Sequence, residues 1–196
     1  EYILDNPEKT VVQMDTLIGR IGGKAILTLH FPVGNFMVGK LLENKNTQSV
    51  SQVFVELRER LIEDGFQFAD IFPVILTDNG SEFSDIFSIE NNVYGEKESM
   101  LFFCDPNQPN QKPHIEKNHT LFRDIVPKGE SFDEFSQNTL DLIFSHINSV
   151  KRKELNGKSP FDVFTFMFNE TLANTLGIRC IEAPEVVQSP KLLKVN

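Results

Sequence analysis

The first part of the chain carries short apolar runs typical of β-strands. The runs TVVQMDTLIG (10–19), KAILTLHF (24–31) and FMVGKLL (36–42) are rich in apolar and β-branched residues, and each predicts a strand. The turn formers Pro32 and Gly34 separate the second run from the third. We therefore expect the chain to open with an antiparallel meander of three strands.

The apolar period then changes to that of a helix over residues 47–64, and Gly65 stands where this helix would end. Its apolar face would consist of Val50, Val53, Phe54, Leu57 and Leu61. The runs 71–77 and 99–104 predict two buried strands, the first of which should start after Pro73. A short helix is expected between these two strands.

Helices are predicted for most of the remaining chain. Pro113 opens one helix, and Ser131 with Glu134 in capping-box spacing opens another over 131–148. Ser159 and Pro160 start a last helix that runs to Gly177. The tail from residue 178 either adds a strand or packs on the core. The order of elements predicts a mixed α/β fold with a central sheet.

Composition fits an ordinary soluble globular protein, with 40% apolar and 24% charged residues. No apolar run approaches the ~20 residues that span a membrane. The 18 Phe residues are interpreted as core, and Cys104 and Cys180 as two reduced, buried thiols. Because the chain opens with Glu1 rather than Met, we expect a fragment that lacks upstream domains.

The net charge of −9 is unusual for a protein that binds nucleic acid. Basic residues nevertheless collect in the second half of the chain, and a local basic patch binds phosphate even when the total charge is negative. A cluster of metal-binding carboxylates would also add negative charge that bound cations offset. The charge balance therefore predicts only weak affinity for nucleic acid from this chain alone.

Three acidic residues stand out by their position. Asp15 lies within an apolar strand, where a carboxylate is costly unless it is paired or ligated. Asp78 ends an apolar strand, and Glu116 comes early in a helix. Each has a structural alternative, because Asp before Asn-Gly forms turns and Glu near a helix N-terminus complements the dipole. Asp105 is a competing acid, although Asp-Pro most simply forms a turn.

These acids fall in sequence blocks that resemble the catalytic core of retroviral integrases and insertion-sequence transposases, most closely the insertion-sequence-thirty group. The blocks are QMDTLIG with Asp15, LTDNGSEF with Asp78, CDPNQPNQKPHIEKNHTLFRDIVPKG with Glu116, and the C-terminal SHINSVKRKELNGKSPFDVF. The resemblance covers most of residues 10–170. One departure is Lys112-Pro113-His114, where relatives usually carry a Gly before the Glu.

The resemblance implies a ribonuclease-H-like α/β fold, with a mixed five-stranded sheet of three antiparallel strands followed by parallel strands, flanked by helices. The catalytic core would occupy residues 8–176, and residues 177–196 would be a C-terminal extension of uncertain structure. Asp15, Asp78 and Glu116 would bind two Mg²⁺ or Mn²⁺ ions for phosphodiester hydrolysis and DNA strand transfer. A ribonuclease-H-type nuclease without strand transfer, or a decayed core acting as a binding module, stays open.

The implied partners are DNA, namely the ends of a mobile element and target DNA, and further copies of the chain in the active complex. No membrane partner is expected, and the protein would be cytoplasmic in a bacterium and associated with the nucleoid when bound to DNA. The side chains expected to contact DNA, for which solvated surface positions are the alternative, are Lys112, Lys117, His119, Arg123, Lys151, Arg152 and Lys153. His114 and His119 flank Glu116, where either would orient a substrate or water.

Overall fold

The computed structural model describes residues 2–104 and 113–194, and the side chains of Leu4, Pro113, His114, Glu116 and Lys117 lie outside that description. Over these ranges, five strands form one sheet in the order β3-β2-β1-β4-β5. The strands are β1 (Val11–Ile18), β2 (Ala25–Phe31), β3 (Phe36–Leu42), β4 (Val74–Thr77) and β5 (Met100–Phe103). Each lies inside its predicted run, so the five strand predictions are confirmed.

The sheet is mixed in the way the sequence predicts. Strands β1 to β3 form an antiparallel meander, while β1 pairs with β4, and β4 with β5, in parallel. Strand β2 is buried along its whole length because neighbouring strands and helices cover it. Because β1 is the central strand, it has the antiparallel strand β2 on one side and the parallel strand β4 on the other.

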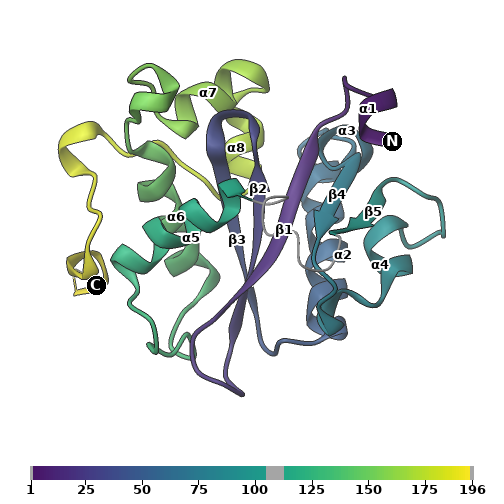
Figure 1. The fold of residues 1–196 in the computed structure, drawn as a ribbon, viewed down its shortest axis with the longest axis horizontal. Coiled ribbons are helices and arrows are strands. Elements are labelled where there is room, and N and C mark those ends of the chain that lie inside the picture. Colours follow the sequence, from purple (N-terminus) through teal and green to yellow (C-terminus); the bar gives the residue numbers. More distant parts are fainter. Residues whose placement is uncertain (1, 105–112, 195–196) are drawn as a thin grey trace.

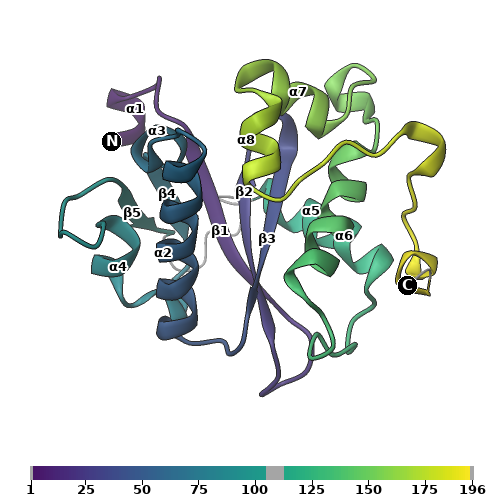
Figure 2. The same cartoon turned by 180° about the vertical axis from the view of Figure 1, so that it is seen from behind.

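Helices cover both sides of the sheet. The helix α2 lies on one side of the sheet and α5 on the other, as Figures 1 and 2 show from opposite directions, while α6 runs alongside the edge strand β3. The α-helices are α1 (Tyr2–Asp5), α2 (Thr47–Glu63), α3 (Phe68–Ile71), α4 (Ile86–Glu90), α5 (Pro113–Ile125), α6 (Gln137–Ser149), α7 (Pro160–Met167) and α8 (Glu170–Thr175). Short 3₁₀ helices are η1 (Val33–Asn35), η2 (Ser81–Phe83), η4 (Lys153–Leu155), η5 (Ala183–Glu185) and η6 (Pro190–Lys194).

Phenylalanine fills much of the core, as the composition suggests. Ten of the largest side chains with less than 2% exposure are Phe. Phe36 and Phe164 stack with ring centroids 3.9 Å apart, which joins β3 to α7. Such aromatic pairs add stabilisation beyond the apolar area that they bury.

Two amide side chains of α6 complete the hydrogen bonds of the edge strand β3. The Asn148 amide accepts from the backbone N–H of Met37 at 3.0 Å and donates to the Met37 carbonyl at 2.7 Å. Gln137 accepts from the N–H of Leu41 at 2.9 Å and donates to the carbonyl of Gly39 at 2.9 Å. The helix thus occupies positions at which a further strand would pair, which protects the edge from other chains.

The predicted start of the helix over 131–148 is wrong by six residues. Helix α6 begins at Gln137, and Ser136 caps it by accepting from the N–H of Thr139. The Ser131 hydroxyl instead accepts from the N–H of Asp133. The Asp133 carboxylate is bound to the N–H of Lys24 at 2.9 Å, so a tertiary contact replaces the predicted capping box.

The predicted last helix consists of two helices. Ser159 and Pro160 open α7 as expected, although the capping box pairs Ser159 with Asp162. The helix stops at Phe168, whose backbone is not helical, and Asn169 caps α8 by accepting from the N–H of Leu172. The non-helical backbone of Phe168 and the new N-cap at Asn169 therefore divide the predicted helix in two. The continuous apolar face of the sequence was a poor guide to helix length.

The tail packs against α6 rather than adding a strand within the described residues. The backbone N–H groups of Arg179 and Ile181 donate to Ser145 and Ser149 of α6, and Leu192 is buried. One prediction about the cysteines is wrong, because Cys180 is exposed and Cys104 is half-buried. Among the described helices, none is long and apolar enough to cross a membrane.

Candidate active site

Asp15 lies on β1, and Asp78 directly follows β4, the parallel neighbour of β1. The pairing of β1 with β4 runs to Gln13 opposite Leu76. The Thr77 hydroxyl then donates to the Met14 carbonyl at 3.0 Å, which carries the alignment one residue further. Asp78 follows directly after the carboxyl end of β4 and is therefore adjacent in register to Asp15 of β1.

Asp15 is half-buried and fixed by its own strand neighbours. One carboxylate oxygen, Oδ1, accepts from the backbone N–H of Thr16 at 2.7 Å. On the other side, the Thr28 hydroxyl of β2 donates to the Asp15 backbone carbonyl at 3.1 Å, and Thr28 is the cross-strand partner of Asp15. The sheet thus sets both the position and the direction of this acid.

Asp78 is exposed and belongs to a tight turn, as its Asn-Gly successor suggested. Its Oδ1 accepts from the backbone N–H of Gly80 at 3.1 Å. The Asn79 amide donates to the Cys104 carbonyl at 3.4 Å, which ties the turn to the end of β5. Asp78 can both form the turn and bind a ligand, because the turn holds its carboxylate in an exposed position at the carboxyl end of β4.

Helix α5 approaches the same place through His119. The His119 Nε2 atom lies 2.9 Å from the hydroxyl of Thr28, the residue paired with Asp15. Glu116 precedes His119 by three residues in α5, but its side chain lies outside the described residues. Among the side chains that the structure does describe, no three His, Cys, Asp or Glu form a group that would hold a metal ion.

The predicted DNA-contacting side chains differ in their surroundings. Lys151 and Lys153 are exposed, whereas Arg152 is 6% exposed and donates to Asn118 Oδ1 at 2.9 Å. The Arg152 side chain therefore packs inside the protein and stabilises it there. The prediction that it contacts DNA is wrong. Burial lowers the pKa of its guanidinium from the usual value.

Arg123 is also engaged within the fold. Its guanidinium donates to the Ile18 carbonyl at 2.8 Å and lies over the rings of Phe122 and Phe132. Partial burial lowers its pKa from the usual value. Lys112, Asp105 and the side chains of His114 and Lys117 lie outside the described residues, so their predicted roles stay predictions.

Glu82 is a buried acid to which sequence reasoning gave no role of its own. It is 3% exposed, and its Oε1 accepts from the Thr16 hydroxyl at 2.8 Å. The Lys45 ammonium lies 3.2 Å from the same oxygen. The signal available in the sequence was its place four residues after Asp78, in the block LTDNGSEF.

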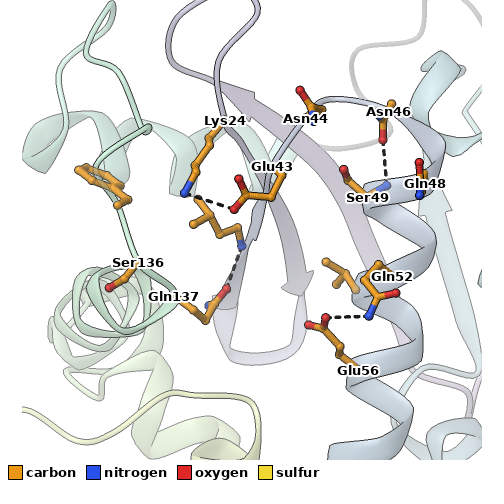
Figure 3. A pocket seen from close by; sticks show the side chains of 13 residues that line it. Lys24, Glu43, Asn44, Asn46, Gln48, Ser49, Gln52, Glu56, Ser136 and Gln137 are labelled. Atoms are coloured by element: carbon orange, nitrogen blue, oxygen red, sulfur yellow. Dashed lines mark hydrogen bonds and ion pairs between the residues drawn. The ribbon is translucent and has the colours of Figure 1, made fainter.

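A separate cleft of about 740 Å³ lies between α2, the end of β3 and the start of α6. Figure 3 shows Glu43 paired with Lys24 on one side of it and Gln52 bonded to Glu56 on the other. Many of the polar side chains that line this cleft bond to other groups of the protein in this way. Asp15 and Asp78 are not among the lining residues, so this cleft is distinct from the candidate site.

Sequence comparison relates the chain to integrases and transposases. It is 30% identical over 165 residues to a candidate integrase, ORF3, of Spiroplasma virus SpV1-R8A2 B, which covers 82% of this chain and 48% of that protein. It is 38% identical over 74 residues to the transposase of insertion sequence element IS1086 from Cupriavidus metallidurans, covering 38% of this chain and 21% of the relative. The chain spans about half the length, or less, of these curated relatives. No family model matches it.

Structural comparison identifies the fold. The catalytic core domain of BIV integrase superposes with a TM-score of 0.56 at 17% identity, covering 80% of this chain and 94% of that domain. A simian T-cell lymphotropic virus intasome, solved in complex with a PP2A regulatory subunit, gives a TM-score of 0.56 at 12% identity, covering 78% of this chain and 53% of that one. The predicted ribonuclease-H-like fold, with its mixed five-stranded sheet, is confirmed. The chain has homologues among integrases and insertion-sequence-thirty transposases and the fold of an integrase catalytic core.

Proposed function

We propose that this chain, a transposase or integrase catalytic core by homology and fold, is a divalent-metal-dependent polynucleotidyl transferase. It would hydrolyse a phosphodiester at the end of a mobile element and then join the freed 3′ hydroxyl to target DNA. The observation that carries the proposal is the adjacent register of Asp15 and Asp78, at the carboxyl end of β4. Open α/β sheets bind their ligands at such strand ends.

The donor set near β1 and β4 fits a hard divalent cation. Asp15 and Asp78 supply carboxylate oxygens, which Mg²⁺ prefers, and Glu116 of α5 is the proposed third ligand. When bound, two Mg²⁺ or Mn²⁺ ions would supply Lewis-acid stabilisation of the attacking and leaving oxygens.

The chain's own groups hold the two acids in place. The Thr16 and Gly80 N–H groups each donate to one carboxylate oxygen, of Asp15 and Asp78 respectively. Such hydrogen bonds restrict the rotation of the two carboxylates, so that less reorganisation is needed when substrate binds. The N–H groups are part of the strand and the turn, so their direction is set by the fold.

DNA is the proposed partner, with mobile-element ends and target DNA as its two forms. The exposed Lys151 and Lys153 are proposed to contact the phosphate backbone, as are Lys112 and Lys117. His119 is proposed to orient substrate or water from its position beside Thr28. The active complex is proposed to contain several copies of the protein.

The test uses full-length protein and labelled duplexes taken from the DNA that flanks its gene. Cleavage and strand-transfer products are measured with Mg²⁺, with Mn²⁺ and with a chelator. We expect Asp78→Asn to lower both activities by more than about 100-fold, because a ligand should cost at least as much as the residues that orient ligands. The matched control is Asp70→Asn, an exposed acid of α3, which should keep wild-type activity.

The products separate the alternatives. Cleavage without joined products would replace the proposal with a ribonuclease-H-type nuclease. If Asp78→Asn retains full activity, the mechanism is wrong. If the wild-type protein neither cleaves DNA nor binds Mn²⁺ in a calorimetric titration, the core acts as a binding module only.

A further inference from the structure

Glu82 is a buried acid that lies next to the candidate catalytic acids. With 3% exposure, its carboxylate has lost most of its hydration, which is costly unless hydrogen bonds and an opposite charge replace the water. The replacements are the Thr16 hydroxyl at 2.8 Å and the Lys45 ammonium at 3.2 Å, both on Oε1. These contacts come from β1 and from the loop between β3 and α2, so Glu82 joins two distant segments.

The contact with Thr16 connects Glu82 to Asp15. The Thr16 side chain donates to Glu82, while its backbone N–H donates to Asp15 Oδ1 at 2.7 Å. One residue therefore bridges the two carboxylates. Holding the Thr16 side chain restrains the backbone at the point that orients Asp15.

The turn after β4 connects Glu82 to Asp78. A Cβ atom added to Gly80 would come within 2.7 Å of Glu82 Oε2, so the Glu82 carboxylate packs directly against this turn. The Gly80 N–H in turn donates to Asp78 Oδ1 at 3.1 Å. Glycine at position 80 thus leaves the space in which Glu82 reaches Thr16 and Lys45.

We propose that Glu82 is a positioning residue for the candidate metal site, which it serves by holding Thr16 against Asp15 and by supporting the Asp78 turn. Lys45 is its counter-ion. This inference rests on the proposed function, because it assigns Asp15 and Asp78 the role of metal ligands. Glu82 itself is not assigned a metal contact or a place in the reaction.

The test measures Mn²⁺ binding to the full-length protein by calorimetry, beside activity at varied Mg²⁺ concentration. Residues that orient metal ligands typically contribute about 10-fold to 100-fold in affinity or activity. We expect Glu82→Gln to weaken Mn²⁺ binding by about 10-fold or more, and to raise the Mg²⁺ concentration needed for half-maximal activity. The matched control is Glu90→Gln, an acid paired with Lys97 at 2.8 Å on α4, which should change neither quantity.

A second pair of variants keeps the proposal testable if Glu82→Gln fails to fold. Thr16→Val removes the hydroxyl that binds Glu82 and should weaken Mn²⁺ binding, while Thr16→Ser retains the hydroxyl and should restore it. The positioning role is overturned if the folded Glu82→Gln or Thr16→Val proteins bind Mn²⁺ like wild type. A wild-type protein that binds no Mn²⁺ would instead overturn the proposed function, and this inference with it.

Discussion

Asn148 offers a sharp test of how the edge strand β3 is held. Its side chain is fully buried and makes two hydrogen bonds to the backbone of Met37, one as acceptor and one as donor. The variant Asn148→Ala removes both partners and leaves the N–H and carbonyl of Met37 inside the protein. Met37 is itself 0% exposed, which leaves little room for water to replace the lost partners.

The expected cost follows from the desolvation of these two backbone groups. A buried donor or acceptor that loses its partner costs about 1–3 kcal/mol. Two such groups, discounted for local relaxation, predict that Asn148→Ala lowers the free energy of unfolding by about 2–5 kcal/mol. That is a large part of the ~5–15 kcal/mol by which a domain of this kind is stable.

Urea unfolding followed by circular dichroism measures this loss. The matched control is Gln137→Ala, because Gln137 makes the same pair of amide contacts to β3 from a half-buried position. Water can replace the lost partners there, so we expect a cost of only about 0.5–1.5 kcal/mol. A cost below about 1 kcal/mol for Asn148→Ala, or one equal to that of Gln137→Ala, would refute the reasoning.

Two further predictions concern neighbouring residues of β3. Gly39→Ala should destabilise the protein by about 3 kcal/mol or more in the same unfolding assay, because the added Cβ would overlap the ring of Phe144. A cost below about 1 kcal/mol would contradict this packing. Burial lowers the pKa of Lys40 from 10.5 to about 8, so between these values the unfolded chain binds a proton that the folded chain does not. This group therefore makes stability rise as the pH increases from about 8 towards 10.5. The increase should be smaller in Lys40→Met, and an unchanged pH dependence of unfolding would refute it.

The strands were predictable from sequence because their signal is local. Apolar runs bounded by turn formers located all five, and Gly65, with a φ of 83°, follows the end of α2 as expected. The start of α6 was not predictable in this way. Ser131 and Ser136 both precede acceptable helix sequences, and the choice between them depends on the contact of Asp133 with Lys24, which is distant in sequence.

In the candidate site, too, local sequence signals were informative and long-range contacts could not be predicted. Position along the strands singled out Asp15 and Asp78 as candidate ligands, and the register of β1 and β4, extended by the bond of Thr77 to Met14, makes them neighbours. The interior role of Arg152 was missed because the run Lys151–Lys153 is hydrophilic throughout, and only the packing against Asn118 separates its middle residue from its neighbours. A local sequence pattern cannot report such a long-range partner.

The location of Glu82 bears on how an acidic chain could act on DNA. Asp15, Asp78 and Glu82 concentrate negative charge at one end of β4, and Lys45 is paired with the most buried of the three. Like charges that gather in one region destabilise a fold unless cations or hydrogen bonds offset them, and they also repel a phosphate backbone. Bound divalent cations would offset both effects at once, since they neutralise the acids and attract phosphate oxygens. The net charge of −9 is therefore compatible with the proposed reaction, provided that metal binding precedes the approach of DNA.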